Sequence, residues 1–127
     1  MITGKYPALR LRRNRKFDWT RRLLRENDLS SNDLILPIFL TNGKNKITKI
    51  SNMPDVYRYS VDNIPKIIDK ALKNKIPMIA LFPETNKNKK NSLGTEALNE
   101  NNLVCQAIRR IKNKFKNEIG IMTDVAL

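Results

Sequence analysis

The sequence predicts an α/β fold in which a basic arm precedes alternating strands and helices. Three short runs are apolar on both faces, at residues 33–40, 77–82 and 119–127, as in strands that are covered on two sides. Amphipathic helical segments separate these runs, and each connection is long enough to hold a helix, so the strands are expected to pair in parallel. We therefore expect an arm over residues 1–31 and a βαβαβ unit over residues 32–127.

The arm over residues 1–31 is too polar to form a core of its own. It gathers the basic residues Arg10, Arg12, Arg13, Arg15, Lys16, Arg21, Arg22 and Arg25. Asp18 is placed to cap a short helix that ends near Asn27. The narrow apolar stripe of this helix consists of Trp19, Leu23 and Leu24. Such a stripe has to dock on another surface.

The first predicted strand contains Pro37, which cannot donate a ladder hydrogen bond and therefore indicates an edge position or a local irregularity. The polar residues 41–55 are expected to form a loop followed by a turn. A helix then begins with Ser60 or Asp62 as its cap. Its apolar face carries Ile64, Ile67, Ile68, Ala71 and Leu72.

The second predicted strand leads into a hydrophilic connection over residues 84–99, which is much longer than most strand-to-helix loops. Long loops at this end of a strand are often functional. A second helix follows, with apolar residues at helical spacing: Val104, Ala107, Ile108, Ile111 and Phe115. The third strand is interrupted by Asp124.

The expected strand order leaves one face of the sheet uncovered. Right-handed crossovers between sequential strands place both helices on the same face. Either a doubly wound sheet or a barrel closed by further strands would cover the other face. The chain ends on an apolar strand without a polar tail, which favours the barrel and an incomplete βαβαβ part over residues 32–127. A complete three-stranded regulatory domain is the alternative.

The formal charge of +13, from 25 Lys and Arg against 12 Asp and Glu, attracts anions and brings nucleic acid into consideration. However, only Tyr6, Phe17 and Trp19 accompany the arginines of the arm, and no RNP-type motif or recognition helix is evident. Arginine-rich arms also dock on neighbouring subunits, because guanidinium groups form paired hydrogen bonds with carboxylates. We expect no nucleic-acid partner, with a small nucleic-acid-binding domain as the alternative.

Other features limit the available chemistry. No stretch reaches the ~20 apolar residues of a membrane span, and the amino terminus lacks a secretory signal, so we expect a cytoplasmic protein without a membrane partner. The chain has no histidine and a single cysteine, Cys105, which excludes a Cys-based metal cluster within it. Chemistry must use carboxylates or lysines. Cys105 and the loop lysines Lys87, Lys89 and Lys90 are assigned no role.

Asp124 is the candidate active-site residue. It lies near the carboxyl end of an apolar strand, where burial of a charge is costly unless the charge is paired, binds a metal or faces a site. In parallel sheets and barrels this end of the strands carries the active site. A cap for the following turn is an equally supported interpretation of Asp124.

Several segments, in one order over almost the whole chain, resemble porphobilinogen synthase, also called 5-aminolevulinate dehydratase. These segments are residues 6–15, 33–39, 52–60, 80–83, 94–97, 102–109 and 123–127. Several matching blocks in the same order identify a family far more specifically than one motif does. The resemblance implies the amino-terminal part of a TIM (β/α)8 barrel, comprising the arm and the first two and a half βα units.

The resemblance also implies a lyase that condenses two molecules of 5-aminolevulinate to porphobilinogen, in the biosynthesis of haem and other tetrapyrroles. The two lysines that hold the substrates as Schiff bases lie on later strands and have no counterpart here, so this chain alone is expected to be inactive. Asp124 matches an active-site residue with a supporting role. By resemblance, Arg10, Arg12, Arg13 and Arg15 belong to an arm that embraces a neighbouring subunit, usually within a homo-octamer.

Metal use is also implied by the resemblance. Zinc-dependent members place the first cysteine of a three-cysteine cluster two residues after this aspartate, where Ala126 stands here. Because thiolate ligands select zinc, Ala126 indicates the branch that uses magnesium. We expect no metal ion to be bound by this chain alone. Asp55 is a second departure, since the family often has glycine there, and a positive φ would strain aspartate less than most residues.

Overall fold

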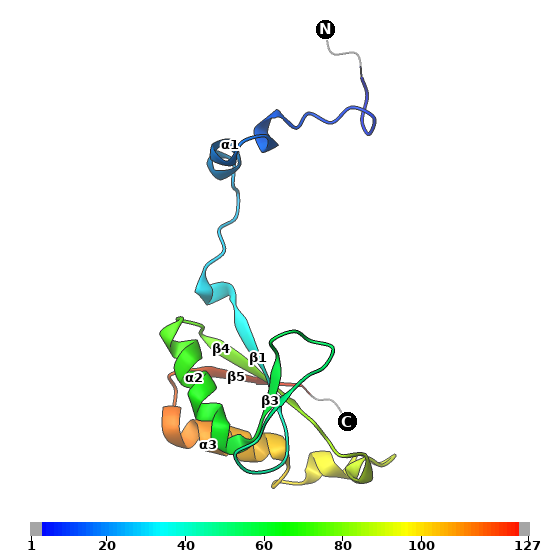
Figure 1. Ribbon diagram of the computed structural model, residues 1–127, viewed down its shortest axis with the longest axis vertical. Helices are drawn as coiled ribbons and strands as arrows, with labels where there is room; N and C mark the ends of the chain where they lie inside the picture. Colours follow the sequence, from blue (N-terminus) through cyan, green and yellow to red (C-terminus); the bar gives the residue numbers. More distant parts are fainter. Residues whose placement is uncertain (1–3, 125–127) are drawn as a thin grey trace.

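The computed structural model describes residues 4–124, and at its centre is one five-stranded sheet (Figure 1). The strands in chain order are β1 (Ile35–Leu40), β2 (Ile47–Lys49), β3 (Tyr57–Tyr59), β4 (Met78–Pro83) and β5 (Gly120–Thr123). Their order across the sheet is β2–β3–β1–β4–β5. β1 is parallel to both β3 and β4, β4 is parallel to β5, and β2 pairs antiparallel with β3. The predicted α/β class with parallel central strands is confirmed.

The two main helices, α2 (Ile64–Lys73) and α3 (Leu103–Phe115), lie on the same side of the sheet (Figure 1). They form one core with alternate residues of β1 and β4, since successive strand side chains point to opposite faces. The buried members are Ile38, Leu40, Ile64, Ile68, Ala71, Ile79, Leu81, Ala107, Ile111, Phe115 and Ile119. The apolar faces predicted for both helices are therefore the faces that pack on the sheet.

Pro37 is tolerated because β1 is only partly paired on one side. β4 aligns with β1 along its full length, from Ile35 opposite Met78 to Leu40 opposite Pro83. β3 aligns with β1 only at Phe39 and Leu40. Of the two expectations for Pro37, an edge position or a local irregularity, the edge position is wrong for the strand as a whole, because β1 lies between β3 and β4. At the level of Pro37, however, β4 is its sole partner among the described strands.

The segment predicted as a loop and a turn, residues 41–55, contains β2, which forms a hairpin with β3 just after it, so the loop part of this prediction is wrong. The strands are three residues each and mostly polar, and so carry no alternating pattern that would reveal them. Backbone bonds hold them in place, and the Ser60 amide also donates to the Lys46 carbonyl oxygen at 3.0 Å. The predicted turn does exist, and Asp55 adopts a φ of 59° within it.

The two helices begin differently. Asn102 caps α3, because its side-chain oxygen accepts a hydrogen bond of 2.8 Å from the Cys105 amide. Neither Ser60 nor Asp62 caps α2, contrary to prediction. The Ser60 hydroxyl instead accepts from the Lys46 amide at 2.8 Å, and the Asp62 carboxylate accepts from the Asn45 amide at 2.8 Å. Both side chains are therefore used to secure the loop between β1 and β2.

The arm extends away from the sheet and contains the short helix α1 (Asp18–Leu23) (Figure 1). Phe17 occupies its cap position, and Asp18 pairs instead with Arg21 at 3.2 Å and with Arg22 at 3.3 Å. The helix ends at Leu23, before the predicted end near Asn27, and it buries none of its residues. The predicted apolar stripe is thus left uncovered in the single chain. Among residues 4–124 we find no helix with the length and apolar character needed to cross a bilayer.

Candidate active site at the carboxyl ends of the strands

The carboxyl ends of β1, β4 and β5 meet at one edge of the sheet, and Asp124 lies directly after β5 at this edge. Its side chain is exposed and lines a cavity of about 440 Å³. Glu84, the loop that follows it and the first turn of α3 form the other walls. The structure therefore places the predicted site residue beside a cavity at the edge where parallel sheets bind ligands. The turn that Asp124 was alternatively expected to cap lies outside the described residues.

A polar network that the sequence did not reveal lies at the same edge. The Glu84 carboxylate accepts a hydrogen bond of 2.7 Å from the Thr41 hydroxyl, and its second oxygen lies 3.6 Å from Nε of Arg58. Thr41 follows β1, Arg58 is in β3 and Glu84 follows β4, so one carboxylate connects three neighbouring strands. The sequence signal that could have identified Glu84 is a charged residue close to the end of the second predicted strand, immediately after Pro83.

The long loop after β4 is tied together by its own side chains. Lys89 and Glu96 form an ion pair with 2.9 Å between Nζ and Oε1. The Lys89 and Asn99 side chains both donate to the Glu96 carboxylate, and these hydrogen bonds hold the pKa of Glu96 below its ordinary value. Lys89, for which the sequence indicates no role, thus stabilises one wall of the cavity. Cys105 is half-buried and lines the same cavity.

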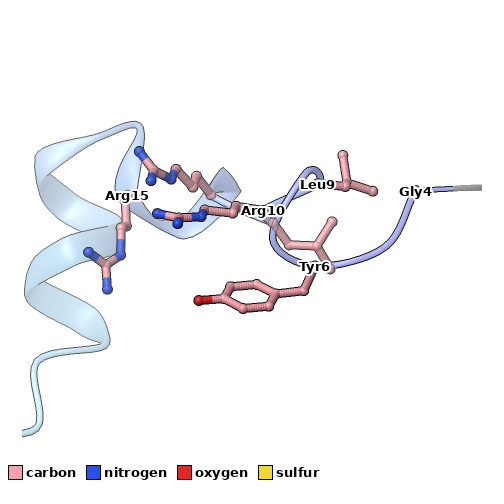
Figure 2. Close-up of a pocket in the computed structure, with 7 residues that line it drawn as sticks. Gly4, Tyr6, Leu9, Arg10 and Arg15 are labelled. Atoms are coloured by element: carbon pink, nitrogen blue, oxygen red, sulfur yellow. The ribbon is translucent and has the colours of Figure 1, made fainter.

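The arm presents a second, open hollow of about 750 Å³ (Figure 2). Its lining includes Tyr6, Arg10, Arg12 and Arg15, whereas Arg13 is not among the lining residues. Figure 2 shows the Arg10 side chain beside the Tyr6 ring, and its guanidinium carbon lies 5.6 Å from the ring centroid. The structure therefore brings three of the four predicted interface arginines together on an exposed surface.

The sequence profile of the Delta-aminolevulinic acid dehydratase family matches residues 8–127, which is almost the entire chain. The chain belongs to this family. The resemblance to porphobilinogen synthase identified from the sequence blocks is thus confirmed, because the two names denote the same family.

Several relatives support this assignment. The Delta-aminolevulinic acid dehydratase of Bradyrhizobium diazoefficiens is 52% identical over 120 residues, which is 94% of this chain and 34% of that protein. The chloroplastic Delta-aminolevulinic acid dehydratase 1 of Arabidopsis thaliana is 39% identical over 119 residues, or 93% of this chain and 27% of that protein. The chain therefore spans between about a quarter and a third of the length of these relatives.

A solved dehydratase structure has the same fold over this region. The crystal structure of the Toxoplasma gondii enzyme in complex with its reaction product porphobilinogen superimposes with a TM-score of 0.79 at 31% identity. The superposition covers 94% of this chain and 33% of the Toxoplasma chain. The strands and helices of this chain therefore correspond to part of a dehydratase fold.

The described part of this dehydratase chain does not form a metal site. Across residues 4–124, no three His, Cys, Asp or Glu side chains gather closely enough to hold a metal ion. Magnesium needs several oxygen ligands in near-octahedral geometry, and Asp124 alone does not supply them. Ala126, on which the expectation of magnesium rests, lies outside the described residues.

Proposed function

We propose that this chain contributes to a porphobilinogen synthase, a lyase that condenses two molecules of 5-aminolevulinate to porphobilinogen in tetrapyrrole and haem biosynthesis. The observation that carries the proposal is the family match over residues 8–127. The 52% identity to the Bradyrhizobium dehydratase and the fold shared with the product-bound Toxoplasma enzyme support it.

Within that enzyme, we propose that the chain forms the arm and the first two and a half βα units of a TIM (β/α)8 barrel. The parallel strands β1, β4 and β5 follow one another across the sheet, and both crossover helices cover one face. The opposite face carries the half-buried side chains of Phe39 and Phe82. Closing the sheet into a barrel with further strands would bury that apolar surface.

Asp124 is proposed to support the reaction at the carboxyl edge of the barrel. A carboxylate beside the cavity can accept a hydrogen bond from a substrate amine or from a water molecule and so orient it. The Schiff-base lysines of the reaction must be free amines, which requires a site that lowers their pKa. Neither of them has a counterpart in this chain, and we therefore propose that it is inactive on its own.

Further properties of the whole enzyme are proposed on the same basis. Arg10, Arg12, Arg13 and Arg15 would dock on a neighbouring subunit within a homo-octamer, since guanidinium groups on an exposed arm suit carboxylates of another chain. Magnesium in place of zinc is proposed because Ala126 stands where zinc-dependent members have a cysteine. We also propose a cytoplasmic location for the whole enzyme.

A chimeric enzyme tests the function directly. Residues 8–124 would replace the matching segment of the Bradyrhizobium dehydratase, and porphobilinogen formation from 5-aminolevulinate would be followed colorimetrically. We expect the chimera to form porphobilinogen and the 127-residue chain to form none. A folded but inactive chimera would argue against the proposed function, and activity of the isolated chain would contradict its dependence on further strands.

A further inference from the structure

Glu84 is bound to the neighbouring strand through both its backbone and its side chain. Its amide donates a hydrogen bond of 2.9 Å to the Leu40 carbonyl oxygen, which extends the ladder between β1 and β4 beyond Pro83. Its carboxylate accepts a hydrogen bond from the Thr41 hydroxyl at 2.7 Å. The loop that begins at Glu84 is therefore attached to the end of β1 at two successive residues.

Thr41 is a rigid partner for this carboxylate. It is only 4% exposed, and its amide donates to the Tyr59 carbonyl oxygen at 3.0 Å. The hydroxyl thus reaches Glu84 from a residue that β3 already holds in place. A hydrogen bond to an ionised acceptor is stronger than one between neutral groups, so the contact with Glu84 gains from the charge of the carboxylate.

Arg58 approaches the same carboxylate from β3. Nε of Arg58 lies 3.6 Å from Oε1 of Glu84, and the two side chains are 32% and 45% exposed. An ion pair with this exposure is weak by itself. Here, however, Thr41 already orients the carboxylate, so that Arg58 completes a contact between three separate strands. We call Thr41, Arg58 and Glu84 the carboxyl-edge clamp.

The clamp lies where the loop after β4 begins, and this loop and Asp124 line the same cavity. Glu84 and Asp124 both line the cavity of about 440 Å³, and the side-chain amide of Asn42 reaches the Glu84 carbonyl oxygen at 3.5 Å. The far part of the same loop is fixed by the pair of Lys89 and Glu96. Movement of Glu84 would therefore displace this wall of the cavity.

We infer that Glu84, held by Thr41 and Arg58, is a positioning residue that fixes the loop over residues 84–97 and so sets the shape of the cavity beside Asp124. The inference rests on the proposed function in naming the cavity as the place of the reaction. Glu84 acts through the loop and not by contact with reacting atoms. The structural part of the inference can be tested without catalysis.

The first test measures amide hydrogen exchange of residues 85–97 in the full 127-residue chain. Thr41→Val removes the hydroxyl at nearly constant volume, and Glu84→Gln removes the charge at nearly constant shape. We expect each to accelerate exchange in this loop by about tenfold, because one charge-assisted hydrogen bond is lost or weakened. Thr41→Ser restores the hydroxyl and is expected to restore slow exchange.

Asp69→Asn is the matched control. It breaks the exposed ion pair of Asp69 with Lys114, which measures 3.2 Å and connects α2 to α3 away from the cavity. This change is expected to leave exchange in the loop unaltered. If Thr41→Val does not fold, Glu84→Gln decides the question by itself. Loop exchange within about twofold of the unsubstituted chain in the folded variants would overturn the inference.

The second test measures kcat and KM of the chimeric enzyme with 5-aminolevulinate. Displacing a positioned group by about 1 Å can cost about 100-fold in rate, so Thr41→Val and Glu84→Gln are expected to lower kcat/KM at least tenfold, with Thr41→Ser rescuing it. An unchanged kcat/KM in both variants would overturn the role in the reaction. If the unsubstituted chimera makes no porphobilinogen, the proposed function fails, whereas loop exchange still decides whether the clamp exists.

Discussion

The rings of Phe39 and Phe82 stack on the face of the sheet opposite α2 and α3, with centroids 5.6 Å apart and planes inclined by 29°. The two residues are directly opposite each other in the register of β1 and β4. They follow the buried Ile38 and Leu81, whose side chains point to the helices. The stack therefore provides a small apolar contact on the face without helices, next to the edge that carries Asp124.

A double-mutant cycle on Phe39 and Phe82 should detect this contact. Each change to alanine is expected to cost about 2 kcal/mol in the free energy of unfolding, since the rings are half-buried, with a coupling of about 1 kcal/mol between them. Urea unfolding of the chain gives both quantities. Leu98→Ala, at a side chain that is 82% exposed, serves as the control and should change little. Additive effects of the two alanines would show that the stack contributes nothing.

Asn102 should contribute to the stability of α3 as its cap. Asn102→Ala removes the acceptor for the Cys105 amide and is expected to cost about 1 kcal/mol in the free energy of unfolding. Asn102→Ser keeps a side-chain oxygen at this position and should cost much less. Equal stability of the alanine and serine variants in urea would show that the cap does not stabilise the helix.

The junction between the arm and β1 should depend on pH through Asp33. Its pKa lies below its ordinary value of 3.8 because the backbone amide and the hydroxyl of Ser30 donate hydrogen bonds to the carboxylate at 2.8 Å and 2.9 Å. A lowered pKa means that the ionised group stabilises the folded junction above pH 3.8. That contribution is lost as the pH falls through the lowered pKa.

The titration of Asp33 can be followed through its side-chain carbonyl carbon by NMR. Ser30→Ala removes the hydroxyl donor and keeps the amide, so the pKa of Asp33 should rise part of the way to its ordinary value. Ser30→Thr retains a hydroxyl and should keep the pKa low. The same low pKa in Ser30→Ala would exclude the hydroxyl as a cause of the shift.

Asp124 should be needed for activity through its charge. In the chimeric enzyme, Asp124→Asn is expected to lower kcat/KM about ten- to hundredfold, which corresponds to the loss of a hydrogen bond to a charged group. Glu118→Gln, at an exposed acidic residue after α3, is the control. Asparagine also caps turns well, so normal activity of Asp124→Asn with impaired stability of Asp124→Ala would favour the turn-capping interpretation.

The arm should control assembly. In the chimeric enzyme, deletion of the whole arm up to residue 31, or joint replacement of Arg10, Arg12, Arg13 and Arg15 by glutamine, is expected to yield a smaller oligomer in light scattering. Arg21→Gln with Arg22→Gln is the matched control, because these two arginines pair with Asp18 inside the arm. An unchanged oligomer after the deletion would contradict the interface role of the arm.

The elements that the sequence predicted correctly are those with a strong hydrophobic period. In α3, Ala107, Ile111 and Phe115 repeat at one-turn spacing, and all three are buried. The hairpin of β2 and β3 was missed, since the residues of β2 are all exposed and backbone bonds define the strand. A hydrophobic period indicates which side chains are buried. A strand that is held only by backbone hydrogen bonds, with no buried side chains, therefore has no such period.

Of the candidate site, the sequence predicted only Asp124, the residue whose position in the sequence by itself indicates a site. Asp124 stands out as a charge at the end of an apolar strand. Thr41 and Glu84 are 43 positions apart, and their contact depends on the register between β1 and β4. No local pattern encodes such a register, which is why the carboxyl-edge clamp emerged only from the three-dimensional structure.

β2 is the outermost strand at its side of the described sheet, and its unpaired edge could template the addition of a foreign strand. Lysines 44, 46 and 49 are exposed along this edge and its approach. An incoming strand would have to desolvate their ammonium groups, and a second copy would also meet like charge. Exposed lysines at this position therefore disfavour edge-to-edge pairing of the sheet with another strand.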